Sequence, residues 1–361
     1  MKPGWGAMRI LHFEGTPARM GEAFGECCRD EIAALYALRL ANALGKALAD
    51  GGRQSSETEL LALAGRCLEA SLRFDPVGHA ELCGIARGAG LSAERVMAMN
   101  GLTDLRDALA FAGPFEAAGG CTAFVVQRDR AADGRLWAGQ TWDLGSDNQP
   151  YVVAVQRKPA QGPETWCVTT VGCLSLMGIN AEGVAVGTTN LRTLDAGPGV
   201  PYLSVIHRAL AATSAASAAA LIARAPRAGG HAYTAVDRSG DAFAIECTAR
   251  RASTIAVRGG FHVHTNHCQL PEHRALEAKL PYASSHARLA RMQELLRTAE
   301  PIDGPYLESC LADRANGALA ICRDDFDGIS TNAALVVCPE GGTLRVCHGQ
   351  PAREPWLDLL G

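Results

Sequence analysis

The sequence changes its periodicity at residue 121, and this change limits the folds that are open to the chain. Before it, apolar residues recur at three- and four-residue steps in stretches rich in Ala, Leu and Glu, which predicts helices over 20–50, 57–74 and 92–102. After it, short β-rich runs dominate. Because helical patterns and strand patterns are grouped rather than alternating, their order favours an α+β layered fold over a βαβ arrangement.

The segment after residue 121 consists mostly of runs rich in β-branched and aromatic residues, separated by Gly, Asp and Asn turns. Helical patterns interrupt these runs at 204–225 and 284–299. The clearest loop in the chain is GPFEAAGG, residues 113–120, which ends directly before Cys121. We predict strands at 121–129, 136–144, 151–158, 164–172, 183–191, 231–248, 253–266 and 333–349.

Composition and charge exclude several classes of protein. Hydrophobic residues make up 48% and charged residues 20% of the 361 residues, which is ordinary for a globular chain and argues against disorder. A net charge of −4 gives no electrostatic reason to expect nucleic acid or an anionic membrane as partner. No apolar run is long enough to span a bilayer, and the N-terminus lacks the apolar core of a secretory signal. We therefore expect a cytoplasmic protein that binds neither nucleic acid nor membranes.

The 13 cysteines are odd in number and include no CxxC pair. In a chain of this length, such a pattern is typical of reduced, mostly buried cysteines in a cytosolic protein. The segment HVHTNHC, residues 262–268, is the closest approach to a zinc motif, but it lacks paired cysteines. We expect no metal and no other cofactor.

Cys121 follows a glycine directly, at the end of the loop and the start of a predicted strand. A thiolate in this position can attack the carbonyl carbon of the preceding residue, and water then releases a new N-terminal cysteine. Such a residue combines a nucleophile with a base, because its α-amine has an ordinary pKa of about 8. The alternative is an inert, buried strand cysteine, and Gly172–Cys173 shows that the dipeptide alone is not specific.

Five segments occur in the order GGCTAF, GQTWDL, GINAEGVAVGTTNL, GHAYTAVDRSGDAFAIE and FHVHTNH. In this order they resemble the acyl-coenzyme A:6-aminopenicillanic-acid acyltransferase family of N-terminal-nucleophile hydrolases, and GTPARMGEAFG with VMAMNGLTDL resembles the leader region of that family. The resemblance implies a four-layer αββα sandwich with a mainly helical N-terminal segment. It also implies an inactive precursor that cuts itself before Cys121 into residues 1–120 and 121–361.

The resemblance assigns roles to individual residues. Cys121 corresponds to the nucleophile and Gly120 to the residue before the cut. Asp143 corresponds to the acidic residue that orients the α-amine or keeps it protonated, and Asn266 to the residue whose side-chain amide faces the developing oxyanion. Thr122 could assist through its backbone N–H or its hydroxyl. From the residues alone, Asp143 could instead cap a turn at a strand end, and Asn266 could be a structural turn residue.

Other polar residues near these motifs have two interpretations. Arg192 and Arg208 could meet an acidic group of the substrate, or they could be structural or solvated arginines. His264 and His267 flank Asn266, but an N-terminal cysteine carries its own base in the α-amine. We therefore assign both histidines to packing or hydrogen bonding.

The expected function is hydrolysis of the amide bond of a small N-acyl amine or N-acyl amino acid, through an acyl-cysteine intermediate. Acyl transfer from a thioester or amide to an amine is the alternative, but no basic cluster or Gly-rich phosphate loop marks a coenzyme A site. Two further alternatives are a non-catalytic ligand-binding protein and a thiol enzyme with a separate Cys–His dyad. We expect the cleaved N-terminal fragment to remain bound as a partner, and the sequence leaves homo-oligomer formation open.

Overall fold

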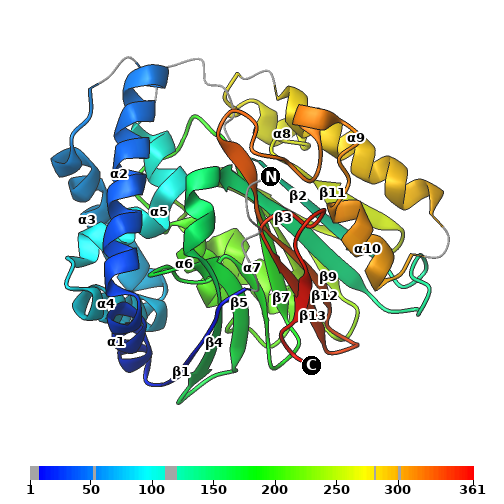
Figure 1. Ribbon diagram of the computed structural model, residues 1–361, viewed down its shortest axis with the longest axis horizontal. Helices are drawn as coiled ribbons and strands as arrows, with labels where there is room; N and C mark the ends of the chain where they lie inside the picture. Colours follow the sequence, from blue (N-terminus) through cyan, green and yellow to red (C-terminus); the bar gives the residue numbers. More distant parts are fainter. Residues whose placement is uncertain (1–7, 52–53, 110–119, 280–281, 300–301) are drawn as a thin grey trace.

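The computed structural model describes residues 8–51, 54–109, 120–279, 282–299 and 302–361. Two β-sheets lie face to face in the middle of the molecule, and helices pack against the outer face of each sheet (Figure 1). This order of layers confirms the α+β class and the αββα sandwich. The predicted loop at 113–120 lies outside the described residues except for Gly120, which begins a strand.

The first sheet is antiparallel except at one edge, where β1 runs parallel to β4. Since β1 comes from residues before the predicted cut, the N-terminal segment completes the edge of a sheet that the rest of the chain builds. In the described part of the chain the strand order is β1 (Ile10–Gly15), β4 (Val152–Pro159), β5 (Thr165–Thr170), β6 (Met177–Asn180), β7 (Ala185–Leu191), β8 (Gly230–Val236), β9 (Ala242–Cys247) and β10 (Ala252–Ala256).

The second sheet is antiparallel throughout its described strands. Gln140 on β3 connects it to the first sheet, because its side chain donates to the Thr188 carbonyl on β7 at 3.0 Å and accepts from the Thr188 N–H at 2.7 Å. The neighbouring strand β2, which carries Cys121, is buried at every residue. The order is β11 (Phe261–His264), β2 (Gly120–Val126), β3 (Trp137–Gly145), β12 (Ile329–Cys338), β13 (Thr343–His348) and β14 (Trp356–Asp358).

The helices fall into three groups along the chain. The N-terminal group packs together beside the first sheet, the middle group contacts β7 to β10, and in the last group α9 and α10 cover β2, β3, β11 and β12. No helix in the described ranges combines the length and hydropathy that a bilayer crossing requires. The groups are α1 (Pro17–Cys27), α2 (Arg29–Gly51), α3 (Glu57–Phe74), α4 (Pro76–Ala89) and α5 (Ala93–Leu109); α6 (Tyr202–Ala209) and α7 (Ala215–Arg224); and α8 (Pro271–Arg274), α9 (Ala283–Thr298) and α10 (Gly304–Leu311).

One apolar core joins the N-terminal helices to the sandwich. Ile32 on α2 and Leu82 on α4 belong to the same buried cluster as Val153 on β4. A second cluster lies beneath α9 and α10 and contains Phe124 and Met292. Because the larger cluster includes side chains from both sides of residue 120, the two segments share their main hydrophobic stabilisation.

Several elements differ from the predicted ones. The predicted helix at 20–50 is two helices, α1 and α2, that meet at Cys28. The predicted helix at 204–225 is also divided, because Ser214 and Ser217 form a capping box that starts α7 as a new helix. The strands β1, β6 and β14 and the helices α4, α8 and α10 were not predicted. The residues of β1 are half-buried or exposed without a buried face, so its pairing with β4 leaves little trace in its own sequence.

Candidate active site

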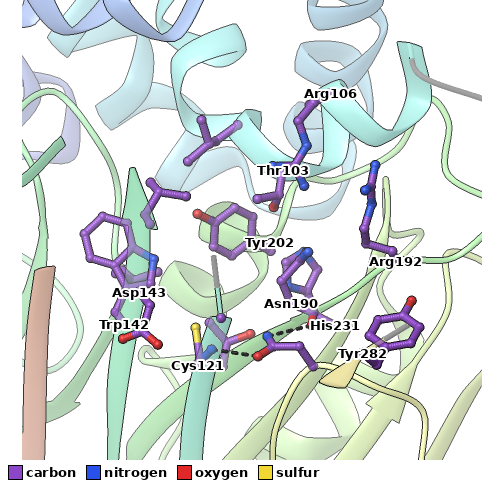
Figure 2. Close-up of a pocket in the computed structure, with 16 residues that line it drawn as sticks. Thr103, Arg106, Cys121, Trp142, Asp143, Asn190, Arg192, Tyr202, His231 and Tyr282 are labelled. Carbon is purple, nitrogen blue, oxygen red and sulfur yellow. Dashed lines mark hydrogen bonds between the residues drawn. The ribbon is translucent and has the colours of Figure 1, made fainter. Parts of the chain in front are cut away.

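A pocket opens beside the first residues of β2, where α5, β3, β7 and β8 come close together (Figure 2). Four of the predicted site residues line it together, namely Gly120, Cys121, Asp143 and Asn266. Arg192 also lines it. The other described lining residues are Leu102, Thr103, Arg106, Trp142, Leu144, Leu176, Thr188, Asn190, Tyr202, His231 and Tyr282.

Cys121 is the second residue of β2 and lies opposite Trp142 of β3 in the strand register. Its side chain is buried, and its backbone N–H donates to Asn266 Oδ1 at 2.7 Å. Burial and the nearby Asp143 charge raise the pKa of the Cys121 thiol to about 12, although the Asp143 and Asn190 backbone N–H groups and the Arg288 cation counteract the rise. In the uncleaved chain the thiol is therefore protonated at neutral pH, and a base must remove its proton before it can act as a nucleophile.

The side-chain amide of Asn266 has a fixed orientation because two hydrogen-bond donors face one end of it and one acceptor faces the other end. Its Oδ1 accepts from the Cys121 N–H and, at 2.8 Å, from Arg288 Nη2, whereas its Nδ2 donates to the Asn190 carbonyl at 3.0 Å. The oxygen, and not the nitrogen, therefore faces the backbone nitrogen of Cys121. An amide nitrogen carries two hydrogens, so the second remains for another acceptor.

Asp143 lies within β3, directly opposite Gly120, rather than at the end of the strand. Thr331 Oγ1 donates to its Oδ1 at 2.7 Å, and its Oδ2 has no hydrogen-bond partner among the described residues. Burial raises the pKa of the Asp143 carboxyl to about 6, against the opposing effects of Arg288, Arg323 and the Thr331 hydroxyl. A carboxyl group that titrates near neutral pH, on the strand beside Cys121, can hold or exchange the proton of an α-amine.

The raised pKa of Asp143 predicts a specific pH dependence of stability. The unfolded carboxyl has its ordinary pKa of 3.8, so between about pH 4 and pH 6 the folded chain binds more protons, and this group's contribution to stability is lost as the pH rises. We expect the loss to reach about 3 kcal/mol by pH 7. Urea unfolding of Cys121→Ala and Cys121→Ala/Asp143→Asn at pH 4 to 7 would measure this loss. As the pH rises, the free energy of unfolding of Cys121→Ala, which keeps Asp143, should fall relative to that of Cys121→Ala/Asp143→Asn. A constant difference would contradict the shift.

Arg288, which the sequence analysis did not single out, is buried and forms the base of the site. From α9 it donates to the Cys121 carbonyl, to Thr122 Oγ1 at 3.0 Å and to Asn266 Oδ1 at 2.8 Å. Burial lowers the pKa of its guanidinium, and the Asp143 and Cys121 groups oppose that effect. No local signal distinguishes Arg288 from the other arginines of its amphipathic helix, because only the packing of α9 on β2 buries it.

Gly120 is close to the polar groups behind the cysteine. A Cβ atom at this position would lie 2.4 Å from Arg288 Nη2 and 3.0 Å from Asn266 Oδ1. The short distance to the guanidinium explains why a residue with a side chain does not fit before Cys121. It also means that a substitution at Gly120 would displace the two side chains that hold the Cys121 backbone.

Gly120→Ala is therefore expected to slow any cleavage before Cys121 by about tenfold or more, since small displacements of reacting groups are costly. The measurement is the full-length fraction on a denaturing gel at successive times after synthesis. Gly45→Ala is the matched control, because a Cβ on this exposed residue of α2 would meet nothing within 4 Å. Equal cleavage rates in the two variants would contradict the prediction.

The remaining predicted binding residues lie at different distances from the pocket. Thr122 is buried behind the pocket wall, where its N–H donates to Thr141 Oγ1 at 3.2 Å. Arg192 lines the pocket, and its Nη2 lies 3.3 Å from Asp107 Oδ1. Arg208 is not a lining residue: it follows the lining residue Tyr202 by six positions on α6, which places it on another face of that helix.

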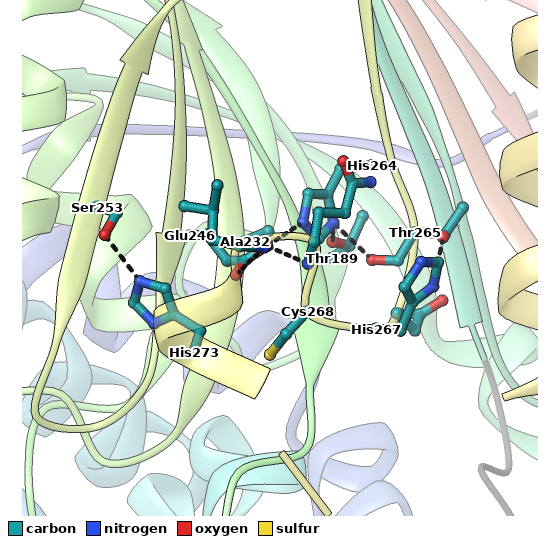
Figure 3. Close-up of polar contacts among 12 residues, drawn as sticks. Thr189, Ala232, Glu246, Ser253, His264, Thr265, His267, Cys268 and His273 are labelled. Atoms are coloured by element: carbon teal, nitrogen blue, oxygen red, sulfur yellow. Dashed lines mark hydrogen bonds and ion pairs between the residues drawn. The ribbon is translucent and has the colours of Figure 1, made fainter. Parts of the chain in front are cut away.

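The two histidines beside Asn266 are hydrogen-bonded, as predicted. His264 Nε2 donates to Glu246 Oε2 at 3.0 Å, and Glu246 also accepts from the backbone N–H groups of Gln269 and Leu270 (Figure 3). Burial lowers the pKa of His267 to about 4, so this residue is neutral at physiological pH.

Ser285 on α9 bonds to the loop after β11 that carries Asn266 and His267. Its Oγ accepts from the Asn266 N–H at 2.7 Å and bonds to His267 Nδ1 at 2.7 Å. With Glu246, it fixes the loop that carries Asn266, and neither residue has a sequence signal of this role.

Within the described ranges, no group of three or more His, Cys, Asp or Glu side chains is arranged to hold a metal ion.

Comparison with known proteins gives a consistent result. Residues 130–353 match the family model described as acyl-coenzyme A:6-aminopenicillanic acid acyl-transferase. The chain is also similar to the 40 kDa form of the acyl-coenzyme A:6-aminopenicillanic-acid-acyltransferase of Emericella nidulans. The two are 26% identical over 330 residues, and this alignment covers 90% of this chain and 88% of that protein.

Two solved structures show weaker similarity. A variant of the conjugated bile acid hydrolase from Clostridium perfringens aligns with a TM-score of 0.47 and 11% identity, over 66% of this chain and 92% of that one. Penicillin V acylase from Agrobacterium tumefaciens aligns with a TM-score of 0.46 and 16% identity, over 66% of this chain and 86% of that one.

Proposed function

Because the chain belongs to the acyl-coenzyme A:6-aminopenicillanic acid acyl-transferase family, we propose that it is a self-processing amide hydrolase with Cys121 as its N-terminal nucleophile. Its substrate would be a small N-acyl amine or N-acyl amino acid. The observation that carries the proposal is the environment of the Cys121 nitrogen, which donates to Asn266 Oδ1 and directly follows Gly120, the residue opposite Asp143 in the strand register. An α-amine released at this position would find an acceptor and a carboxyl group already in place.

Self-processing would begin with transfer of the Cys121 thiol proton to a nearby base and attack of the sulfur on the Gly120 carbonyl carbon. The C–N bond to Cys121 breaks as the nitrogen takes up a proton, which leaves a thioester. Water then hydrolyses the thioester, producing a carboxylate on Gly120 and a free thiol and amine on Cys121. The buried Arg288 supports this step, since it donates to the Cys121 carbonyl and holds the Asn266 side chain.

Turnover would use the same atoms on an external substrate. The α-amine takes the thiol proton, the sulfur attacks the substrate carbonyl carbon, and the leaving amine receives that proton. Water then releases the acyl group. The oxyanion would be stabilised by the second N–H of the Asn266 side chain and by the Asn190 backbone N–H, which faces the Cys121 thiol.

Acyl transfer to an amine is the second candidate function. It is favoured by the similarity to the acyltransferase of Emericella nidulans over most of both chains. The two reactions share the acyl-cysteine intermediate and differ in whether water or an amine resolves it. A purified sample given one N-acyl substrate with and without added amines would distinguish them through the ratio of free acid to new amide.

The proposal is tested first by a denaturing gel of purified, active protein. Cleavage before Cys121 should convert the 37.9 kDa chain into fragments of roughly one third and two thirds of that mass. The fragments should elute together on a sizing column, because β1 pairs with β4 and one apolar core includes both segments. A single full-length band in active protein would refute self-processing and favour a thiol enzyme with a separate base.

The proposed site of action is the cytoplasm. All thirteen cysteines are free, and Cys27 is the one that is exposed. Buried free thiols suit a reducing compartment.

A further inference from the structure

A second acid–base pair lies in the wall of the pocket. His231 on β8 contacts Asp104 on α5, with 2.7 Å between His231 Nε2 and Asp104 Oδ1, and both side chains are 2% exposed. His231 also lines the pocket that contains Cys121, close to Tyr202 (Figure 2). The proposed steps at Cys121 do not use this pair.

The surroundings of the pair hold it in one arrangement. The second oxygen of Asp104, Oδ2, accepts from the Tyr202 backbone N–H at 2.8 Å, and the Tyr202 ring stacks on the His231 ring with centroids 4.5 Å apart. Gly229 leaves the space that the carboxylate needs, because a Cβ there would lie 2.4 Å from Asp104 Oδ1. Both oxygens of Asp104 therefore have partners, and neither can move without breaking a buried contact.

The position of Asp104 decides which nitrogen of His231 carries the hydrogen. A carboxylate only accepts, so in the neutral imidazole the hydrogen is on Nε2 and the lone pair is on Nδ1. Among the described residues, this buried Nδ1 has no hydrogen-bond partner. The pocket wall thus contains a buried acceptor that is oriented by a carboxylate from another element.

A second acceptor lies next to it. Asn190 on β7 is directly opposite His231 on β8 in the strand register, and its Oδ1 is likewise buried without a partner in the described part of the chain. Side chains opposite one another on neighbouring strands have Cβ atoms about 5 Å apart, and both residues line the pocket. What distinguishes these two acceptors is that both belong to residues that line the pocket, where two acceptors together are complementary to a hydrogen-bond donor on a ligand.

We propose that His231 binds the amine half of the substrate by accepting a hydrogen bond from its N–H group at Nδ1, with Asp104 as the residue that positions it. This inference rests on the proposed amide hydrolysis and adds a requirement to it, namely that the leaving half carries an N–H donor. It also gives the N-terminal segment a role in the site, since Asp104 precedes the proposed cut and His231 follows it. Amides of primary amines satisfy the requirement, whereas the matching esters do not.

Asp104→Asn tests the proposal with little change of shape. The Tyr202 N–H needs an acceptor, so the new amide should keep its oxygen on that side and turn its NH₂ toward His231 Nε2. The hydrogen of His231 would then move to Nδ1, and the acceptor in the pocket would become a donor. His231→Gln is the second variant, because its amide nitrogen can still donate to Asp104 while the acceptor at Nδ1 is lost.

The substrates are the propylamide and the propyl ester of the same acid, chosen from hexanoic, octanoic and benzoic acid as the one that the processed wild-type protein hydrolyses fastest. We expect both variants to lower kcat/KM for the amide by about tenfold or more and to leave kcat/KM for the ester within about twofold. His273→Gln is the control, since His273 is a buried histidine that bonds to Ser253 outside the pocket and should change neither value.

Equal losses on amide and ester in both variants, or no loss on the amide in either, would overturn the proposal. A purely structural pair would instead give an Asp104→Asn defect on both substrates and a nearly normal His231→Gln, which would overturn it as well. Failure of the proposed function gives a different result, in which the wild-type protein hydrolyses neither substrate or Cys121→Ala hydrolyses both.

Discussion

Cys121→Ala is expected to run as a single band at the full 37.9 kDa and to hydrolyse no N-acyl substrate. Both effects have the same cause, since the sulfur is the group that would attack the Gly120 carbonyl in the precursor and the substrate carbonyl in the mature protein. The fold should persist, because Ala fits where Cys fits and the Cys121 N–H keeps its bond to Asn266. Denaturing gels and turnover assays on the same preparation provide the measurement.

Cys173→Ala is the matched control for this loss, since Cys173 also follows a glycine and is also buried. It lies in a turn after β5, where Arg39 donates to its sulfur at 3.2 Å, and it is not a lining residue of the pocket. We expect normal processing and turnover in this variant. If cleavage stopped in Cys173→Ala and continued in Cys121→Ala, the assignment of the nucleophile would be wrong.

Arg288→Met is expected to have the second largest effect, because it removes a buried donor from three acceptors at once. The Cys121 carbonyl, Thr122 Oγ1 and Asn266 Oδ1 would lose their hydrogen bond to the guanidinium. Each buried acceptor left without a donor costs about 1 kcal/mol or more, so the free energy of unfolding should fall by about 3 kcal/mol. Processing should slow by about a hundredfold, since Asn266 loses one of the contacts that orient it.

The comparison for Arg288→Met is Arg291→Met, one turn further along α9. Arg291 is partly exposed and pairs with Glu294 and Asp313 at the surface. Surface ion pairs contribute about 1 kcal/mol or less, so this variant should be nearly as stable as wild type and should process normally. Urea unfolding of both variants in the Cys121→Ala background separates stability from cleavage. Equal stabilities would show that Arg288 does not support the site as described.

The sequence predicted which residues gather at the site better than it predicted how they are arranged there. The order of the motifs led to Gly120, Cys121, Asp143 and Asn266, and the structure brings all four to one pocket. It did not predict which atoms of Asn266 face the cysteine, since that depends on Arg288 and on the Asn190 carbonyl. Arg208 was named for its type and proximity in sequence, but the turn of α6 places it outside the pocket.

The sequence predicted the fold class and most of the strands, but it did not predict β1, the strand at the edge of the first sheet. Regular alternation and turn residues are local signals, so the strands that carry Cys121 and Asp143 were found at nearly their observed positions. The strand β1 carries no such signal and is defined by its partner β4, which lies far along the chain. The division of the predicted helix at 204–225 was missed, because a Ser–Ser capping box is a weak local signal.

By itself, the sequence determined the position of the proposed nucleophile, the layered α+β class and the family, because each is encoded by residues that are close together or that follow one another in a fixed order. Only the tertiary structure decided what surrounds Cys121. Arg288 reaches Cys121 across 167 positions and His231 reaches Asp104 across 127 positions. Whether a charged or polar side chain in an amphipathic pattern meets water or a buried partner depends on how distant elements pack. Local periodicity cannot contain that information.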